Sequence, residues 1–197
     1  MIIFEDMLKD RPYLVFKKLY DRAINNNQTN IEAVSVSSFN TKLNEVNSRF
    51  VNLKYIKKDK WIFYTNYRSP KSFDFRSHPQ ISAIFYWSSI NVQIRIRAQI
   101  TKESNLNSDK HYVKRSIEKN ALAWSSDQSS KISSYDEVKE KYFAQLNSDI
   151  SKRPPYWGGY HFIPYYFEFW EGHESRLNKR EAFNKIDGLW KQSYLQP

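Results

Sequence analysis

Apolar and polar residues alternate with a period of two along several segments of the chain. The clearest segment is 92–102, VQIRIRAQITK, in which valine and isoleucine alternate with glutamine and arginine. Such alternation is typical of a strand with one buried and one polar face. Further strand-like runs are 32–39, 49–56, 60–66, 80–87 and 165–172, and a hairpin-like pair is centred on 187–188. The pattern predicts a protein built mainly from short strands.

Helical spacing of apolar residues is confined to a few segments. Segment 10–26 opens with Asp-Arg-Pro, a helix start signal, and then places large apolar residues at roughly helical intervals. Pro70 suits the first turn of a short helix at 69–79, and Pro79 ends it. Two more helices are predicted at about 108–123 and 134–147, and segment 151–162 is predicted to be a loop.

The order of these elements predicts an α+β fold, mainly β with peripheral helices. The strand signals are mostly not separated by long helices, as they would be in a parallel βαβ sheet. An antiparallel closed or split β-barrel fits better. Nothing repeats with a period of 20–50 residues, and a length of 197 residues suits a single domain spanning 1–197.

The amino-acid composition and net charge limit the kinds of molecule that the protein is expected to bind. The formal charge of +10 favours acidic partners, although the cationic residues are scattered, and a scattered excess is usually a solvated surface. No aromatic–basic surface motif for nucleic acid is legible. The chain has no cysteine, no signal-peptide pattern and no apolar run of about 18 residues. We therefore expect a soluble cytoplasmic protein that binds neither nucleic acid nor membrane.

Several kinds of site are excluded by missing motifs. The four glycines form neither GxGxxG nor a P-loop, so any bound phosphate must be held by side chains. The four histidines lack the spacing of a metal site, and we predict no metal. No nucleophile elbow is present.

One cluster of polar side chains is predicted on two paired strands and the helix that follows them. It contains Arg49, Lys54, Tyr64, Thr65 and Lys71. Cationic groups beside the free N–H groups of a helix N-terminus can hold a phosphate. Exposed strand charges are an equally good interpretation of these residues alone.

Two other clusters are weaker. Gln93 and the polar segment 127–132 could donate to a dianion or a ring carbonyl, but a solvated strand face explains them as well. Trp170 closes a strand and is followed by Arg176 and Arg180. A guanidinium can stack on a flat ring or grip a phosphate. The alternative is a charged turn in which Arg176 pairs with a nearby glutamate in water.

In this order, the clusters resemble the pyridoxine/pyridoxamine 5′-phosphate oxidase family of FMN-dependent split-barrel enzymes. The matching pieces are SRFVNLK (48–54), FYTNYRSPK (63–71), HPQISAIFYW (78–87), VQIRIRA (92–98), AWSSDQSS (123–130), YWGGY (156–160), FEFWEG with RLNKR (167–180) and the terminal segment 190–197. No single piece is diagnostic, but eight pieces in register indicate the fold and a flavin site.

The resemblance implies FMN at a homodimer interface, with both chains lining each site and a C-terminal dimerisation and substrate segment at about 165–197. The implied FMN contacts are Arg49, Phe50, Val51, Asn52, Leu53, Lys54, Tyr64, Thr65, Lys71, Gln93, Gln128, Ser129, Trp170 and Arg180. The implied grip on the phosphate of a small-molecule substrate is Lys54, Tyr112, Arg115 and Lys119. Arg176 and Asn178 would lie at the substrate ring as the catalytic pair.

The implied reaction moves a hydride from the substrate C4′ carbon to the flavin, and oxygen reoxidises the flavin to give hydrogen peroxide. Three positions depart from the family pattern: Asn178 replaces a histidine, Lys119 replaces a serine, and Pro70 replaces an arginine. The sequence therefore leaves three functions open. They are a vitamin B6 5′-phosphate oxidase, a divergent flavoenzyme acting on another flat metabolite as in phenazine biosynthesis, and a non-catalytic flavin-binding or basic interaction protein.

Overall fold

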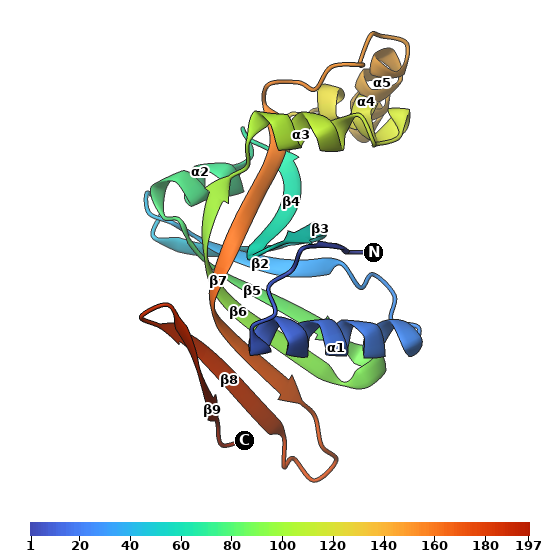
Figure 1. Ribbon diagram of the computed structural model, residues 1–197. Coiled ribbons are helices and arrows are strands. Elements are labelled where there is room, and N and C mark those ends of the chain that lie inside the picture. The colour runs from blue at the N-terminus through green and yellow to red at the C-terminus, as the bar shows by residue number, and fades with distance from the viewer.

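The computed structural model describes residues 1–197 as nine strands, five helices and one 3₁₀ turn (Figure 1). The strands are β1 (Ile3–Glu5), β2 (Ala33–Asn40), β3 (Glu45–Lys57), β4 (Lys60–Asn66), β5 (Gln80–Trp87), β6 (Val92–Lys102), β7 (Trp157–Glu171), β8 (Lys179–Ile186) and β9 (Leu189–Tyr194). The helices are α1 (Arg11–Asn25), α2 (Pro70–Ser77), α3 (Asn105–Tyr112), α4 (Ile117–Ser125) and α5 (Tyr135–Leu146), and the turn is η1 (Ser88–Ile90).

Six of the strands close into a barrel, which confirms the predicted fold class. They follow one another in the ring order β3-β2-β5-β6-β7-β4, and β4 returns to pair with β3. Every pair in this ring is antiparallel. The short strand β1 is added to the outer edge of β3 in parallel, a pairing that the sequence did not indicate.

Strand β7 is long enough to serve two structures. Its first part pairs with β4 and closes the barrel, and its last part pairs with β8. The β8–β9 hairpin, predicted from the turn at Asp187–Gly188, extends away from the barrel at the opposite end from α3, α4 and α5 (Figure 1). None of the five helices is long and apolar enough to cross a lipid bilayer.

The barrel interior is filled by aromatic rings, and α1 covers one end of it. Phe16 on α1 packs against Trp61 and Phe85 with ring centroids 4.5 and 5.5 Å apart, and all three side chains are fully buried. Fully burying rings of this size is one of the largest apolar contributions a core can receive. The alternation predicted for β6 is confirmed, because Val92, Ile94 and Ile96 are buried while the arginines between them are exposed.

Two of the predicted element boundaries are wrong. The helix expected over 108–123 is two helices. The first, α3, begins earlier, where Ser104 Oγ caps it, and ends at Tyr112, and the extended backbone of Ser116 starts α4 separately. The loop expected over 151–162 gives way to strand at Trp157. The glycines that suggested a loop, Gly158 and Gly159, are instead strand residues pressed against aromatic side chains.

The Gly158 position has no room for a side chain. A Cβ there would lie 2.2 Å from the hydroxyl oxygen of Tyr67 and 3.0 Å from Oγ of Ser108. We therefore expect Gly158→Ala to lower the free energy of unfolding by about 1–3 kcal/mol, the usual cost of overpacking. Chemical denaturation checks this. Gly188→Ala serves as a comparison variant whose loss of stability has a different cause. A Cβ at position 188 meets nothing within 4 Å, so the loss there comes only from the positive φ of 79°. An unchanged Gly158→Ala midpoint would contradict the close approach.

Candidate functional site

A pocket of about 290 Å³ opens where β3, β4 and the start of α2 meet the segment 111–128. Ten of its twelve lining residues are among the predicted site residues: Phe50, Val51, Asn52, Lys54, Tyr64, Thr65, Lys71, Arg115, Lys119 and Gln128. The other two, His111 and Trp157, were not predicted. All members of the first predicted cluster except Arg49 thus line one pocket with Arg115 and Lys119, which were implied for the phosphate of a substrate.

The charge of this lining is entirely positive. Lys54, Lys71, Arg115 and Lys119 line the pocket, and no aspartate or glutamate does. Lys54 has a carboxylate partner outside the pocket, Glu32, at 3.8 Å. Four cations converging on a pocket without a counter-charge are suited to an anionic ligand, and more than one anionic group can be accommodated.

Among the four cations, Lys71 gives the strongest evidence for an anionic ligand, because it is buried without an anion beside it. Its side chain belongs to the first turn of α2, and the residue is only 7% exposed. Its Nζ donates to neutral oxygens of Gln128, Ser69 and Thr65, at 3.0, 3.1 and 3.2 Å. Burial, and then the positive charge of Arg49, lower the Lys71 pKa to about 8. An anion beside Nζ would remove this unfavourable arrangement.

Arg49 lies behind Lys71 rather than in the pocket lining. Its Nη1 donates to Ser38 Oγ at 2.7 Å and to the Val36 carbonyl at 3.2 Å, and its Nη2 is 3.9 Å from Asp74. Burial lowers the pKa of this guanidinium, while Asp74 opposes the shift. Arg49 therefore adds positive potential to the Lys71 end of the pocket.

Arg115 lines the pocket and has a guanidinium N–H donor that no protein atom accepts. Its guanidinium lies over the Trp157 ring, 4.2 Å from the centroid, and Nη2 donates to the Lys119 carbonyl at 2.7 Å. Its Nη1 is buried and has no hydrogen-bond partner in the chain. A buried guanidinium donor without a partner is costly, and a ligand oxygen would satisfy it.

Tyr112, which was predicted to be part of the phosphate grip, does not line the pocket. The residue is 1% exposed, and its hydroxyl donates to the Ile150 carbonyl at 2.8 Å. His111 occupies the wall of the pocket instead. Counting back without a gap gives His111, Arg115 and Lys119, each four residues apart. This regular spacing of four residues was the signal in the sequence that could have identified His111.

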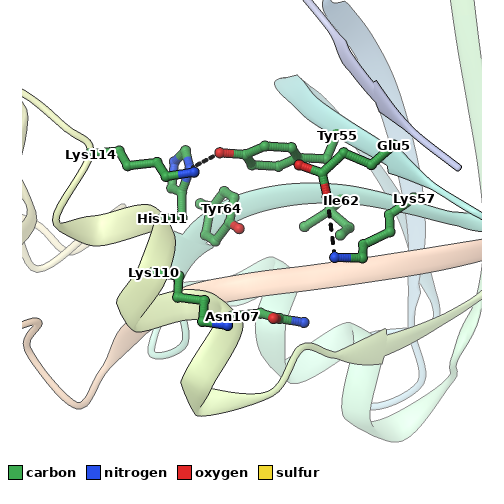
Figure 2. Close-up of a pocket in the computed structure, with 9 residues that line it drawn as sticks. All are labelled: Glu5, Tyr55, Lys57, Ile62, Tyr64, Asn107, Lys110, His111 and Lys114. Atoms are coloured by element: carbon green, nitrogen blue, oxygen red, sulfur yellow. Dashed lines mark hydrogen bonds and ion pairs between the residues drawn. The ribbon is translucent and has the colours of Figure 1, made fainter.

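His111 is held in a stack of aromatic rings. The imidazole lies 3.7 Å from the Tyr64 ring at an interplanar angle of 10°, and Tyr64 in turn stacks on Trp157. The Nδ1 of His111 is 3.0 Å from the Tyr55 hydroxyl (Figure 2). Burial, followed by the nearby positive charge of Arg115, lowers the His111 pKa to about 4. The neutral imidazole is held in place by its hydrogen bond with the Tyr55 hydroxyl.

His111 is therefore expected to stay neutral well below its ordinary titration range. An NMR titration of the imidazole protons, with the signal assigned by its absence in His111→Gln, should show the midpoint near pH 4. Between about pH 4 and 6.5 the unfolded chain binds a proton that the folded chain does not, so this residue lowers stability as the pH falls. His111→Gln should therefore flatten the loss of unfolding free energy over that interval. A midpoint at pH 6.5 or above would contradict the burial of the ring.

Within one chain, Gln93 lies apart from Gln128, whereas Trp170 and Arg180 of the third predicted cluster are neighbours. Gln93 lies opposite Trp170, and Trp170 lies opposite Arg180, so the three side chains form a row across one face of β6, β7 and β8. None of them lines the pocket. Gln128 was grouped with Gln93 but lies instead at Lys71, which accounts for its place in the pocket.

The Arg180 guanidinium already forms hydrogen bonds within the chain. Its Nε and Nη2 donate to the buried Glu168 carboxylate at 3.0 and 2.8 Å, and its Nη1 donates to the Gln196 carbonyl at 2.8 Å. This fixes the guanidinium beside Trp170 on the strand face.

Arg176 and Asn178 lie in the exposed connection between β7 and β8. Arg176 has a left-handed backbone, with φ of 60°, and its N–H donates to the His173 carbonyl. The Asn178 Oδ1 accepts from the His173 N–H at 3.0 Å, so Asn178 shapes this turn. The ion pairs nearby involve Lys179 and Arg180, and Arg176 forms none with a glutamate.

Two further predicted contacts fall outside the pocket. The Leu53 side chain is fully buried in the core, so only its backbone can reach a ligand. Ser129 is exposed, has a positive φ of 71°, and lines a neighbouring depression rather than the pocket. The alternation of β3 explains the first case, because Leu53 points inward between the pocket residues Asn52 and Lys54.

Comparison with known proteins places these features in one family. Residues 22–147 match the family model described as pyridoxamine 5′-phosphate oxidase, and residues 157–197 match the pyridoxine 5′-phosphate oxidase C-terminal dimerisation region. The second match supports a homodimer. It also includes the part of β7 from Trp157 onward that sequence reasoning had taken as a loop.

The chain is similar along most of its length to curated proteins of one name. The pyridoxine/pyridoxamine 5′-phosphate oxidase of Synechocystis sp. is 31% identical over 198 residues, covering 99% of this chain and 92% of that protein. The protein of the same name from Burkholderia cenocepacia is 37% identical over 155 residues, covering 76% and 72%.

Solved structures share the fold. PhzG from Burkholderia lata, in complex with tetrahydrophenazine-1-carboxylic acid, superposes with a TM-score of 0.90 at 24% identity over 98% of this chain and 99% of that one. An FMN-binding protein from Nostoc punctiforme related to pyridoxamine 5′-phosphate oxidase gives 0.75 at 13% identity, covering 97% and 99%. Family and fold agree. The chain belongs to the pyridoxamine 5′-phosphate oxidase family of flavin-dependent oxidoreductases.

Proposed function

We propose that this protein is an FMN-dependent oxidase that converts pyridoxamine or pyridoxine 5′-phosphate to pyridoxal 5′-phosphate, with molecular oxygen as the electron acceptor. The observation that carries the proposal is the pocket lined by Lys54, Lys71, Arg115 and Lys119 without a carboxylate. A flavin nucleotide and a phosphorylated substrate each bring one phosphate, and two anionic groups match four cations.

The residues at one end of the pocket fit the phosphate of FMN. Lys71 is a buried cation with only neutral partners, and Arg49 adds a second positive charge behind it. Thr65 supplies a hydroxyl beside Lys71. A phosphate at this point would be held by charge-assisted hydrogen bonds, which are about twice as strong as neutral ones. Pro70 replaces the family's arginine here and leaves Lys71 and Arg49 as the cations at this end.

The residues at the other side fit the phosphate of the substrate. Arg115 offers the partnerless Nη1, and Lys54 and Lys119 add point charges. His111, neutral and held by its hydrogen bond with Tyr55, adds a polar ring nitrogen without adding charge. Lys119 in place of the family's serine makes this grip more positive, which suits a phosphate dianion.

A second copy of the chain is needed to complete the site in this proposal. The row of Gln93, Trp170 and Arg180 is separate from the pocket within one chain. In a homodimer, the partner's copy of this row and of the turn carrying Arg176 and Asn178 would close over the flavin and the substrate ring. The exposure of Phe50 at the pocket edge, 75%, is consistent with a face that a second chain covers.

The chain's own residues bind and orient, and the redox chemistry is that of the cofactor. Bound FMN would supply the ring that accepts a hydride from the substrate C4′ carbon while the alcohol or amine loses a proton. The imine formed from the amine would react with water and release ammonia, and oxygen would take the two electrons from the flavin to give hydrogen peroxide. The phosphate grip fixes one end of the substrate, and Arg176 and Asn178 would fix its ring. Holding the two reacting rings in the right orientation is the main way in which a protein can accelerate a hydride transfer between them.

Steady-state assays distinguish this function from the alternatives. With FMN and pyridoxamine 5′-phosphate, pyridoxal 5′-phosphate and hydrogen peroxide should form in equal amounts. Oxidation of a dihydrophenazine carboxylate, with no reaction of pyridoxamine 5′-phosphate, would favour a phenazine-type enzyme. A protein that binds FMN but oxidises neither compound would favour a non-catalytic role. Either result would overturn the proposal.

Restoring the family's histidine at position 178 should speed turnover. The amide of Asn178 can form a hydrogen bond but cannot carry charge, and a positioned ionisable group commonly contributes a hundredfold or more. We expect Asn178→His to raise kcat for pyridoxamine 5′-phosphate by about tenfold, since it also removes the hydrogen bond to the His173 N–H. Asn178→Ala, which removes that bond without adding an imidazole, is the control. Equal kcat values for Asn178→His and Asn178→Ala would contradict a place at the substrate ring.

A further inference from the structure

A second pocket, of about 210 Å³, lies on the other side of Tyr64 and His111 from the site described above. Both residues line both pockets, so they form the wall between them. Figure 2 shows the second pocket, with side chains reaching in from α3 on one side and from β1, β3 and β4 on the other.

Positive charge dominates this second pocket as well. Lys57, Lys110 and Lys114 line it, and Glu5 is the only acidic residue there. Glu5 pairs with Lys57 at 3.2 Å, which leaves Lys110 and Lys114 without a carboxylate partner. The uncompensated charge of the lining is therefore +2, from Lys110 in the last turn of α3 and Lys114 just after the helix.

Hydrogen-bonding groups of the wall and floor face the same space. The Tyr64 hydroxyl points toward the region between Lys110 and Lys57 (Figure 2). Asn107 also lines the pocket and already donates one amide N–H to Glu103 at 3.1 Å. Ile62 supplies a buried apolar floor. Lysines, a phenol hydroxyl and an amide around an apolar floor suit a small phosphate ester better than a free inorganic ion.

We propose that this pocket is a second anion site, which binds a small phosphate monoester between α3 and β3 behind the Tyr64–His111 wall. Its charge of +2 matches a phosphate dianion, and its volume admits a phosphate with one small organic group. The site is separate from the cationic pocket of the oxidase, because Lys57, Lys110 and Lys114 do not line that pocket. Binding at this second site requires no flavin chemistry, so the test of this proposal is independent of the test of the proposed function.

The wall gives the second site a physical link to the first. Tyr64 and His111 stack at 3.7 Å, and Tyr55, which lines only the second pocket, holds Nδ1 of His111 at 3.0 Å. A dianion beside Lys114 would also add negative potential on one side of an imidazole whose other side faces the substrate grip. Binding of an anion at the second site should therefore change the electrostatic potential at His111.

Calorimetric titration of the FMN-loaded full chain with phenyl phosphate at pH 7.5 tests the proposal. Two saturable sites per chain are expected. The double variant K110Q/K114Q should lose one of them, with at least a tenfold drop in affinity, and Arg115→Lys should weaken the other. The control K9Q/K18Q removes two positive charges from exposed lysines at the start of the chain and on α1, and should keep both sites.

Two results would overturn the proposal. One is a single binding event in the wild-type chain that Arg115→Lys weakens. The other is equal binding by K110Q/K114Q and K9Q/K18Q. All four lysines are exposed, and circular dichroism on each variant keeps a folding defect from being mistaken for a lost site. If no FMN binds, the same titration is made on the chain as purified, and the comparison between the two double variants is unchanged.

Discussion

Replacing Lys71 with methionine should abolish tight FMN binding and at the same time make the cofactor-free protein more stable. The two effects have one cause. Lys71 is buried among neutral oxygens, so its positive charge is unfavourable until an anion joins it. Charged hydrogen bonds contribute about 1.5–3 kcal/mol each, so loss of the ammonium should weaken FMN by roughly 10- to 150-fold, or more if two bonds are lost.

The gain in stability follows from the lowered pKa. The unfolded chain binds a proton at Lys71 up to about pH 10.4, whereas the folded, cofactor-free chain releases it near pH 8. Stability of the cofactor-free protein should therefore rise between pH 8 and 10, and Lys71→Met should remove that rise. At neutral pH the variant should be more stable by about 1–2 kcal/mol, because each pKa unit corresponds to about 1.4 kcal/mol and the lost hydrogen bonds offset part of the gain.

Fluorescence titration of FMN and urea denaturation measure the two quantities. The control is Lys18→Met, which replaces an exposed lysine of α1 and should change neither. A Lys71→Met protein that binds FMN as the wild type does would exclude this lysine from the phosphate site. A variant that loses both FMN binding and stability would point to a structural role instead.

Exchanging Arg115 for lysine should raise KM for pyridoxamine 5′-phosphate by about 10- to 100-fold while leaving the flavin content unchanged. Lysine keeps the charge but cannot lie flat on Trp157 or present a planar fork. The loss should be confined to the phosphate, so oxidation of unphosphorylated pyridoxamine should be affected little. The preference for the phosphorylated compound, measured as a ratio of kcat/KM values, should shrink by the same factor.

Arg76→Lys is a matched control for this exchange. Arg76 also lies over an aromatic ring, Phe73, at 4.4 Å, but it belongs to the outside of α2 and does not line the pocket. Its kinetic constants should be those of the wild type. If Arg115→Lys lowers kcat/KM for both substrates equally, the guanidinium does not contact the phosphate, and its assigned place is wrong.

The sequence was most informative where local pattern and fold agree. Strands β4, β5 and β6 have the predicted bounds because their alternation or aromatic content matches a barrel wall with one buried face. The first predicted cluster came together because β3 and β4 pair, which brings Lys54 to Tyr64, Thr65 and the start of α2. Pairing of neighbouring strands is a short-range property that a sequence can signal.

The remaining errors concern positions that depend on long-range packing. Gly158 and Gly159 read locally as a loop, but β7 uses them to approach Tyr67 and Tyr64. The exchange of Tyr112 for His111 depends on which side of α3 faces the barrel, and a one-residue shift turns a helix by about 100°. Spacing along the chain also does not show that Gln93 and Gln128 lie apart within one chain.

The central claim is that the cationic pocket holds FMN beside a phosphorylated vitamin B6 amine or alcohol whose C4′ hydride the flavin accepts. Anaerobic mixing of the FMN-loaded protein with pyridoxamine 5′-phosphate tests it most directly. The flavin absorbance near 450 nm should fall within one turnover and return when air is admitted. A flavin that is bound but keeps its oxidised spectrum through prolonged anaerobic incubation would contradict the account.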